Sequence, residues 1–178
     1  MARTNQSHSS HAATTAKSRR TRRTRRRDPL TVSLLKKDHR QVEEWFDEYE
    51  QLEDEGEKLA LFQQIALALK VHTKIEEEIF YAEERGEVED DILDEAQVEH
   101  ESAEKMITEI EAMRPSDDLY DAKVKVLGEY VKHHVKEEER PGGIFAQAKR
   151  GDQDLEEMGG RLKTRKEELM AQLGKPHH

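Results

Sequence analysis

Hydrophobic side chains recur at steps of three and four residues through most of the chain, which is the period of an amphipathic helix. This pattern predicts helices over about residues 30–53, 57–84 and 89–113, and a fourth helix that ends at Pro141-Gly142-Gly143. Four long helices with short connections predict an all-α, up-down-up-down four-helix bundle. The inward positions are Leu35, His39, Val42, Phe46 and Tyr49; Ile65, Leu69, His72, Glu76 and Phe80; Leu93, Ala96, His100, Ala103, Ile107 and Ile110; and Leu127, Val131, His134 and Glu138.

The segments around these helices differ from them in composition. Gly56 and the turn-forming residues 115–118 indicate breaks before the second and fourth helices. Residues 1–27 are mostly Ser, Thr, Ala, His and Arg and lack the apolar side chains needed to fold. A short segment around 144–149 and a polar helix over about 152–172 end the chain. We therefore expect three parts: a disordered basic tail (1–28), a four-helix bundle (29–150) and a C-terminal helical extension (151–178).

Charge is distributed unevenly along the sequence. Of the 178 residues, 39% are charged and only 5% are aromatic, a composition more typical of long helices than of sheet. Residues 1–27 contain nine basic and no acidic side chains, whereas the remainder contains 21 basic and 40 acidic ones. The formal net charge of −10 therefore combines a cationic tail with a domain of charge −19.

Several classes of protein are excluded by what the sequence lacks. There is no cysteine, which excludes disulfides, iron–sulfur clusters and thiolate zinc sites. No apolar run approaches the roughly 18 residues that cross a bilayer. The apolar segment that a signal peptide requires does not follow the N-terminal arginines. We expect a soluble, cytoplasmic protein that does not contact membranes.

Each of the four apolar stripes carries one histidine, and two of them carry a glutamate one turn later. A single buried histidine is more often a hydrogen-bonded core residue than a ligand. A buried carboxylate, however, must be paired or must coordinate a cation. Each glutamate lies four residues after a histidine and so shares its helix face, and the order His, then His-x-x-x-Glu, occurs twice. We predict two metal ions with the ligands His39, His72, Glu76, His100, His134 and Glu138.

The types of ligand narrow the choice of metal. Imidazole suits Zn, Cu, Fe and Ni, whereas carboxylate favours harder ions. A lone structural zinc ion needs only four ligands. Six ligands, two of which are potentially bridging carboxylates, therefore indicate two iron ions. On these residues alone, two manganese ions, a manganese–iron pair or two zinc ions remain open alternatives.

Four segments resemble the HHE cation-binding branch of the hemerythrin family: LLKKDHRQVEEWFDEYE, VHTKIEEEIFY, DEAQVEHESAEKMITEIE and VKHHVKEEER. They span about residues 30–150, and the metal positions of the family fall on the six residues named above. The resemblance implies a left-handed bundle with an oxo- or hydroxo-bridged, non-haem di-iron centre that meets dioxygen, peroxide or nitric oxide. Oxygen-carrying hemerythrins have a second histidine one turn after the position of His100. This chain has Glu104 there, which either binds metal or faces outward.

Some polar residues near these motifs allow more than one interpretation. His133 precedes Glu137 by four residues, as His134 precedes Glu138, but the steps along the apolar stripe favour His134. Asp38 is interpreted as an exposed side chain, and an acceptor that orients an imidazole is the alternative. The other acidic residues of the motifs are interpreted as solvated helix surface: Glu77, Glu78, Glu137 and Glu139.

The resemblance favours a protein that binds or decomposes small oxidants in oxidative or nitrosative stress, including a peroxide-decomposing, catalase-like activity. The alternative is a non-catalytic oxygen or iron sensor, or an iron-handling module, that acts through a partner. A third hypothesis, a metal-free interaction bundle, would treat the histidines as core residues.

The basic tail suggests a separate interaction. Residues 17–27 contain eight cationic side chains, which would allow salt-dependent contact with nucleic acid. No aromatic side chain interrupts this run, so base stacking is not indicated. The tail could equally bind an acidic protein surface or act as a solubilising extension.

Overall fold

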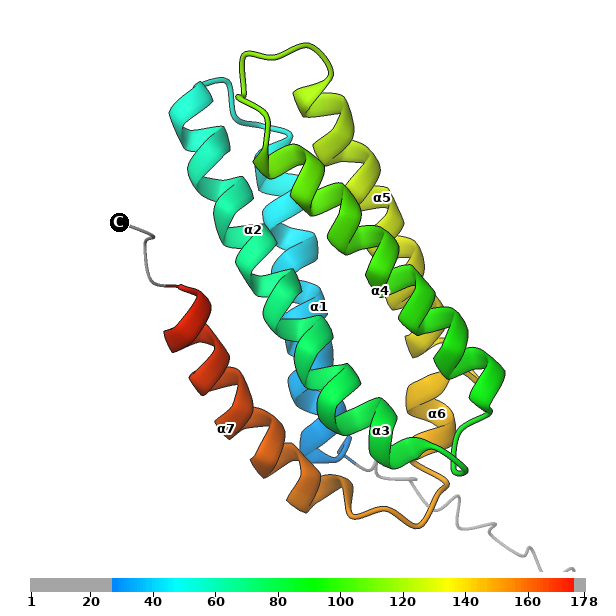
Figure 1. Cartoon of the computed structure of the whole chain (residues 1–178). Helices are drawn as coiled ribbons and strands as arrows, with labels where there is room; N and C mark the ends of the chain where they lie inside the picture. The colour runs from blue at the N-terminus through cyan, green and yellow to red at the C-terminus, as the bar shows by residue number, and fades with distance from the viewer. Residues whose placement is uncertain (1–26, 175–178) are drawn as a thin grey trace, which may run out of the picture.

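The computed structural model describes residues 27–174, and all the regular elements in that range are helical. Four long helices run alternately up and down, as the sequence predicts (Figure 1). The all-α bundle is therefore confirmed. The long helices are α1 (Leu30–Tyr49), α2 (Glu55–Ile75), α4 (Asp90–Glu111) and α5 (Tyr120–Glu139), and the shorter or flanking elements are η1 (Glu76–Phe80), α3 (Tyr81–Glu84), α6 (Ile144–Ala148) and α7 (Leu155–Leu173).

Two helix starts differ from the sequence prediction in detail. The side chain of Asp54 accepts hydrogen bonds from the backbone N–H groups of Gly56 and Glu57, so α2 begins before the predicted glycine break. The 115–118 segment does form a turn, but α5 is preceded by Leu119 in a left-handed conformation, with φ of 71° and no side-chain cap.

The predicted second helix is one continuous rod with a π-helical turn near its end. In η1 the backbone N–H of Tyr81 donates to the carbonyl of Glu76, five residues earlier, where an α-helix would use a four-residue spacing. The wider turn places both Phe80 and Tyr81 inside the bundle, although they are consecutive in the sequence. The π-helix therefore begins at one predicted metal ligand, Glu76, and ends before Tyr81, whose hydroxyl reaches another, Glu138.

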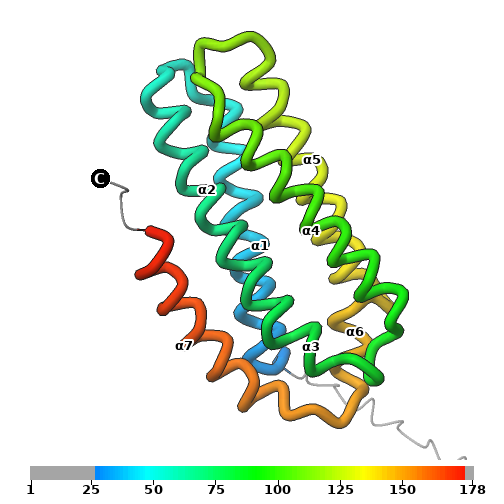
Figure 2. Tube along the Cα trace, in the orientation of Figure 1, coloured from blue at the N-terminus to red at the C-terminus, as the bar shows by residue number. Residues whose placement is uncertain are grey.

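Helix α7 packs along the outside of α1 and α2 (Figure 2). Its sequence is polar, yet one edge of the helix is apolar and is buried in a hydrophobic core cluster together with Val32 and Leu35 of α1. It is thus an amphipathic fifth helix joined to the bundle. The tail prediction concerns residues that lie outside the described range, apart from Arg27 and Asp28. The side chains that α7 buries in this cluster are Leu155, Met158, Leu162 and Leu169.

A layer of polar side chains divides the hydrophobic core into two clusters. On α1, Leu35 belongs to one cluster and Val42 to the other, and His39 lies between them. Burying such a layer is unfavourable unless its polar atoms find partners. Among the helices of residues 27–174, none is both long and apolar enough to span a membrane.

Candidate metal centre

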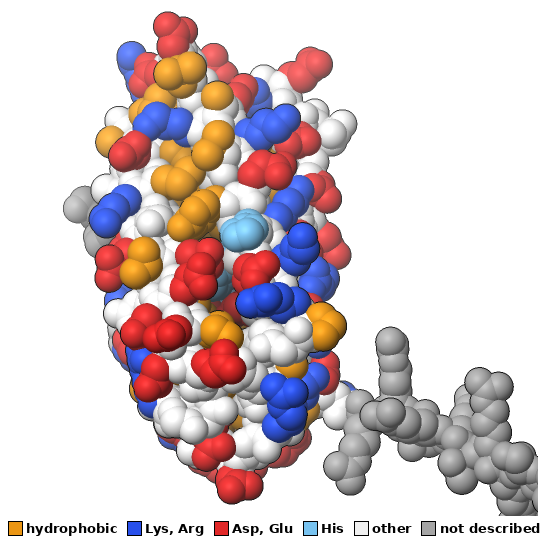
Figure 3. Space-filling model, turned by 90° about the vertical axis from the view of Figure 1, so that its right-hand side faces the viewer, with side chains coloured by type: hydrophobic (Ala, Val, Ile, Leu, Met, Phe, Trp, Pro, Cys, Tyr) orange, Lys and Arg blue, Asp and Glu red, His pale blue; other side chains and the backbone are white. Residues whose placement is uncertain are grey.

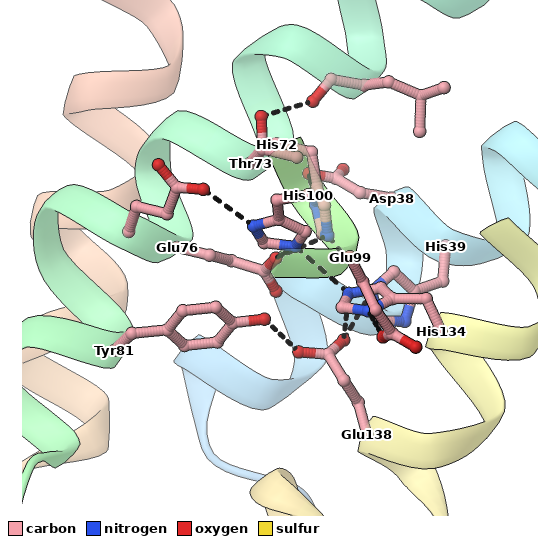
Figure 4. A network of polar contacts seen from close by, with 12 residues as sticks. Asp38, His39, His72, Thr73, Glu76, Tyr81, Glu99, His100, His134 and Glu138 are labelled. Carbon is pink, nitrogen blue, oxygen red and sulfur yellow. Dashed lines mark hydrogen bonds and ion pairs between the residues drawn. The ribbon is translucent and has the colours of Figure 1, made fainter. Parts of the chain in front are cut away.

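The six side chains predicted as ligands meet inside the bundle (Figure 4). All six are buried. Each of the four long helices contributes at least one of them, and η1, the direct continuation of α2, contributes Glu76. They form two groups that share Glu76, and within each group the possible ligand atoms lie within 4.8 Å of one another. One group consists of His39, His72, Glu76 and Glu138, and the other of Glu76, His100 and His134.

The histidines form two pairs, and the carboxylates lie beside both. In the first pair (His39 and His72) and in the second pair (His100 and His134), the two Nε2 atoms are 3.1 Å apart. Glu76 Oε2 lies 3.1 Å from the nearer Nε2 of the first pair and 3.4 Å from that of the second. The corresponding distances from Oε2 of the sixth residue, Glu138, are 3.2 and 3.8 Å.

Outside this inner ring, three carboxylates accept hydrogen bonds from the Nδ1 atoms of the histidines. Such a contact keeps the proton on Nδ1 and turns the Nε2 lone pair inward. The interpretation of Glu77 and Glu139 as solvated surface alone is therefore wrong, and Glu99 was missed. The distances are 2.9 Å for His39–Glu139, 3.0 Å for His100–Glu77 and 2.7 Å for His134–Glu99.

The fourth histidine has a looser partner. Oδ2 of Asp38 lies 3.6 Å from Nδ1 of His72, beyond a good hydrogen bond. The other carboxylate oxygen of Asp38 accepts from Lys166 of α7. Of the two interpretations of Asp38, the structure supports a residue that faces an imidazole.

The buried polar atoms at the centre fit a bound cation. When Nδ1 carries the proton, the two Nε2 lone pairs of each histidine pair face each other and repel. Both carboxylate oxygens of Glu76, and Oε2 of Glu138, are buried without a hydrogen-bond donor. Unpaired buried groups of this kind are costly. Positive ions between the imidazoles and carboxylates would satisfy all of these atoms together.

The electrostatic environment points the same way. Burial opposes the charged form of His72, but Glu76 and Asp38 outweigh it and raise the pKa of His72 to about 10. Burial likewise opposes protonation of His100, yet Glu76 and Glu77 raise its pKa to about 9. Burial alone would raise the pKa of Glu76, but its two histidine neighbours hold it well below the usual range. The centre therefore favours positive charge.

Tyr81 adds a hydrogen-bond donor that the sequence analysis did not identify. Its hydroxyl donates to Oε1 of Glu138 at 2.7 Å, and its ring stacks on His100 with centroids 5.5 Å apart. Burial and then the charges of Glu138 and Glu76 raise the pKa of Tyr81 well above its normal value, so the hydroxyl keeps its proton. The signal available in the sequence was the consecutive aromatic pair that follows the His-x-x-x-Glu motif.

The structure also distinguishes the remaining candidates. The side chain of His134 is 10% exposed, whereas that of His133 is 62% exposed, so His134 is the inward-facing histidine of the two. Glu104 is exposed and belongs to neither ligand group. Glu78 pairs with Arg165. Glu137 pairs with Arg140 and does not contact the centre.

A cavity of about 290 Å³ reaches the histidines from outside. The space-filling view of the side that faces right in Figure 1 shows an exposed histidine among acidic and basic side chains (Figure 3), whereas each of the four histidines of the centre, taken as a whole residue, is at most 7% exposed. All four histidines line the cavity, while Glu76 and Glu138 do not. Small molecules would therefore approach from the imidazole side. The lining also includes six buried apolar side chains: Val42, Leu69, Ala103, Ile107, Val131 and Val135.

Two adjacent histidine–carboxylate groups inside a helical bundle are typical of helical cation-binding proteins. The chain belongs to the hemerythrin family, because the model of the Hemerythrin HHE cation binding domain matches residues 30–141.

Two relatives extend this comparison. A hemerythrin HHE cation binding domain-containing protein from Mycobacterium kansasii has a similar fold, with a TM-score of 0.67 and 22% identity. The match covers 79% of this chain and 86% of the other. A protein from Nostoc sp. named DNA nickase is 25% identical over 151 residues. These are 84% of this chain but 42% of that protein, so the chain spans less than half the length of its relative.

Proposed function

We propose that the chain holds two iron ions on its six buried histidine and glutamate side chains. The observation that carries the proposal is the arrangement of the Nε2 atoms: two pairs, each 3.1 Å apart. In at least three of these imidazoles the other nitrogen faces a carboxylate within hydrogen-bond distance. Four inward lone pairs and three carboxylate oxygens without a hydrogen-bond donor would form a set of ligands for two adjacent ions.

Iron is favoured over a structural zinc ion by the composition of this set. The two groups share Glu76, and Glu138 lies near both histidine pairs, so both carboxylates could be shared by two ions. A closed four-ligand zinc site has no need for shared carboxylates. Manganese and zinc remain alternatives that metal analysis distinguishes.

We further propose that this centre binds or decomposes small oxidants, namely dioxygen, peroxide or nitric oxide, in the response to oxidative or nitrosative stress. A pair of redox-active metal ions would supply the electron transfer that such chemistry requires. The chain itself contributes a cavity of about 290 Å³, lined by apolar and polar side chains, that would accommodate small molecules. Tyr81 orients Glu138 through its hydroxyl, and the outer carboxylates hold the imidazoles in one tautomer.

Iron quantitation and an optical spectrum before and after peroxide addition test this proposal, together with measurement of the oxygen evolved. We expect two iron ions per chain, a spectrum that changes with peroxide, and oxygen release. Two bound ions without peroxide turnover would favour the alternative, a sensor or iron-handling module that acts through a partner. One zinc ion, or no metal, after expression with ample iron would contradict the di-iron proposal.

Contact with nucleic acid through the basic tail is a second candidate. Its support is the cationic run before residue 28 and the similarity to a protein named DNA nickase. Full-length protein should shift duplex DNA at low salt, with binding that falls as salt rises by a log–log slope of about −0.9 per phosphate contacted. A chain without residues 1–27, which carries a charge of −19, should not bind. Equal binding by both forms would exclude the tail as the contact.

A further inference from the structure

The two histidine pairs differ in the charge that surrounds them. Behind the second pair, Glu77 and Glu99 accept hydrogen bonds of 3.0 and 2.7 Å from His100 and His134. Among the described residues, no lysine or arginine forms an ion pair with either of these glutamates. Apart from His134 itself, the exposed ring of His133 lies 4.0 Å from Glu99 and could also carry a positive charge.

Behind the first pair, each carboxylate is shared with a permanent cation. Arg40 donates to the same oxygen of Glu139 that accepts from Nδ1 of His39. Lys166 binds Asp38, and Asp38 stays 3.6 Å from His72. Arg40 also pairs with Glu43, so its charge is divided between two carboxylates. The outer negative charge is therefore partly offset by cations at the first pair, whereas in the described part of the chain Glu77 and Glu99 at the second pair have no lysine or arginine partner.

This difference reaches the metal positions through the imidazoles. A carboxylate that accepts from Nδ1 makes the opposite nitrogen a stronger electron donor. A cation bound to the same carboxylate weakens this increase in electron donation. The positive charge of the cation also repels a metal ion a few ångströms away. Helix α7 takes part in this difference because Lys166 is one of its residues.

We infer that the two metal positions are electrostatically inequivalent: the position at His100 and His134 holds the more highly charged ion, and Arg40 and Lys166 lower the preference of the other position for such an ion. Arg40 and Lys166 are thus positioning residues that act through Glu139 and Asp38. This inference rests on the proposed two-metal site and adds to it which of the two positions holds the more highly charged ion.

Loading the protein with one equivalent each of redox-inert Ga³⁺ and Zn²⁺ tests directly which position prefers the trivalent ion. Anomalous scattering from crystals of this protein would identify the ion at each position. We expect Ga³⁺ to be enriched about tenfold at the second pair, which corresponds to about 1.4 kcal/mol. An even distribution, or enrichment at the first pair, would overturn the inference. Binding of fewer than two ions per chain would instead count against the proposed metal site.

Redox titration of the iron-loaded protein gives an independent measurement in solution. Lys166→Gln removes a positive charge from the first position, and Glu99→Gln removes a negative charge from the second. Both should bring the two reduction potentials closer, by about 59 mV for a tenfold change in the equilibrium between the two ions. The mean potential should fall in Lys166→Gln and rise in Glu99→Gln. A merely structural role would not produce this opposite pair of shifts.

Arg161→Gln is the matched control, because it removes one positive charge from the same helix. Arg161 pairs with Glu83 and Glu157, which do not contact a histidine of the centre. The gap between the potentials should be unchanged in this variant, and Lys166→Arg should retain the wild-type gap. Equal narrowing by Arg161→Gln and Lys166→Gln would show a nonspecific effect of net charge and refute the role of Lys166.

Discussion

The hydroxyl of Tyr81 donates a 2.7 Å hydrogen bond to Glu138, which joins the end of the π-helical turn to α5 at the centre of the bundle. In Tyr81→Phe, Oε1 of Glu138 loses this donor while it remains buried. An unpaired buried acceptor costs about 1–3 kcal/mol. We expect the variant to unfold at lower denaturant concentration and to release metal to a chelator faster than the wild type.

Tyr120→Phe provides the control for this prediction. The Tyr120 hydroxyl is also buried but has no hydrogen-bond partner. Its removal should leave stability unchanged or raise it slightly, since no hydrogen bond is lost. If the two phenylalanine variants unfolded alike, the Tyr81–Glu138 bond would have no special role.

Substitution of a histidine of the centre should lower the metal content, whereas substitution of the exposed His133 should not. His72→Ala removes an Nε2 atom from the first pair, and we expect it to lose at least one of the two metal ions. His133→Ala should retain both, because that ring is mostly exposed and faces Glu99 from outside. Metal quantitation after gel filtration measures both variants. A larger loss in His133→Ala would show that the assignment of ligands on α5 is wrong.

The inner residues could be predicted because they interrupt apolar stripes. Four histidines and two glutamates at helical spacing, such as His72 and Glu76, lie on faces that the neighbouring side chains identify as buried. A charged residue on such a face is conspicuous in the sequence alone. The same reasoning gave the order of the four long helices, since each stripe is continuous over several turns.

The outer carboxylates could not be predicted in this way. Glu77, Glu99 and Glu139 each directly adjoin a ligand in the sequence, at the edge of a helix face, where many exposed acids occur. Each contacts a histidine of a different helix, so its role depends on how the helices pack. The π-helical turn was not predicted because a single wider turn hardly changes the hydrophobic pattern. Its only sign in the sequence is the consecutive aromatic pair Phe80-Tyr81.

Removing the metal should reverse the pH dependence of stability. In the metal-free protein, His72 and His100 have pKa values of about 10 and 9, above the value of 6.5 for a free histidine. Their stabilising effect is complete below about pH 6.5 and is lost as the pH rises through 9 to 10. In the loaded protein, protons compete with metal, so stability falls towards acid pH.

Thermal unfolding across this pH range, with chelator and with excess metal, measures both trends. We expect the metal-free protein to melt lower throughout, with the gap between the two forms widening as the pH rises. Parallel curves, or identical melting temperatures, would indicate that the histidines are ordinary core residues.

A carboxyl group outside the centre should also make stability depend on pH. Glu84, at the end of α3, is 0% exposed, and neither of its carboxylate oxygens has a hydrogen-bond partner. Burial, followed by the charges of Glu87 and Glu83, raises its pKa from 4.5 to about 7. The folded state therefore keeps a proton that the unfolded chain loses, and stability falls as the pH rises through this interval.

Glu84→Gln replaces the carboxyl with a neutral group of similar shape, so it should remove this loss. The free energy of unfolding of the variant should exceed that of the wild type by a margin that grows by about 1–2 kcal/mol between about pH 5.5 and pH 8. Glu95→Gln, which changes an exposed glutamate of α4, should differ from the wild type by the same small amount at every pH. Urea unfolding of the metal-loaded proteins provides the comparison, because the contribution of the centre cancels between variants. A constant difference for Glu84→Gln would mean that the buried carboxyl is already ionised or finds a partner when the protein folds.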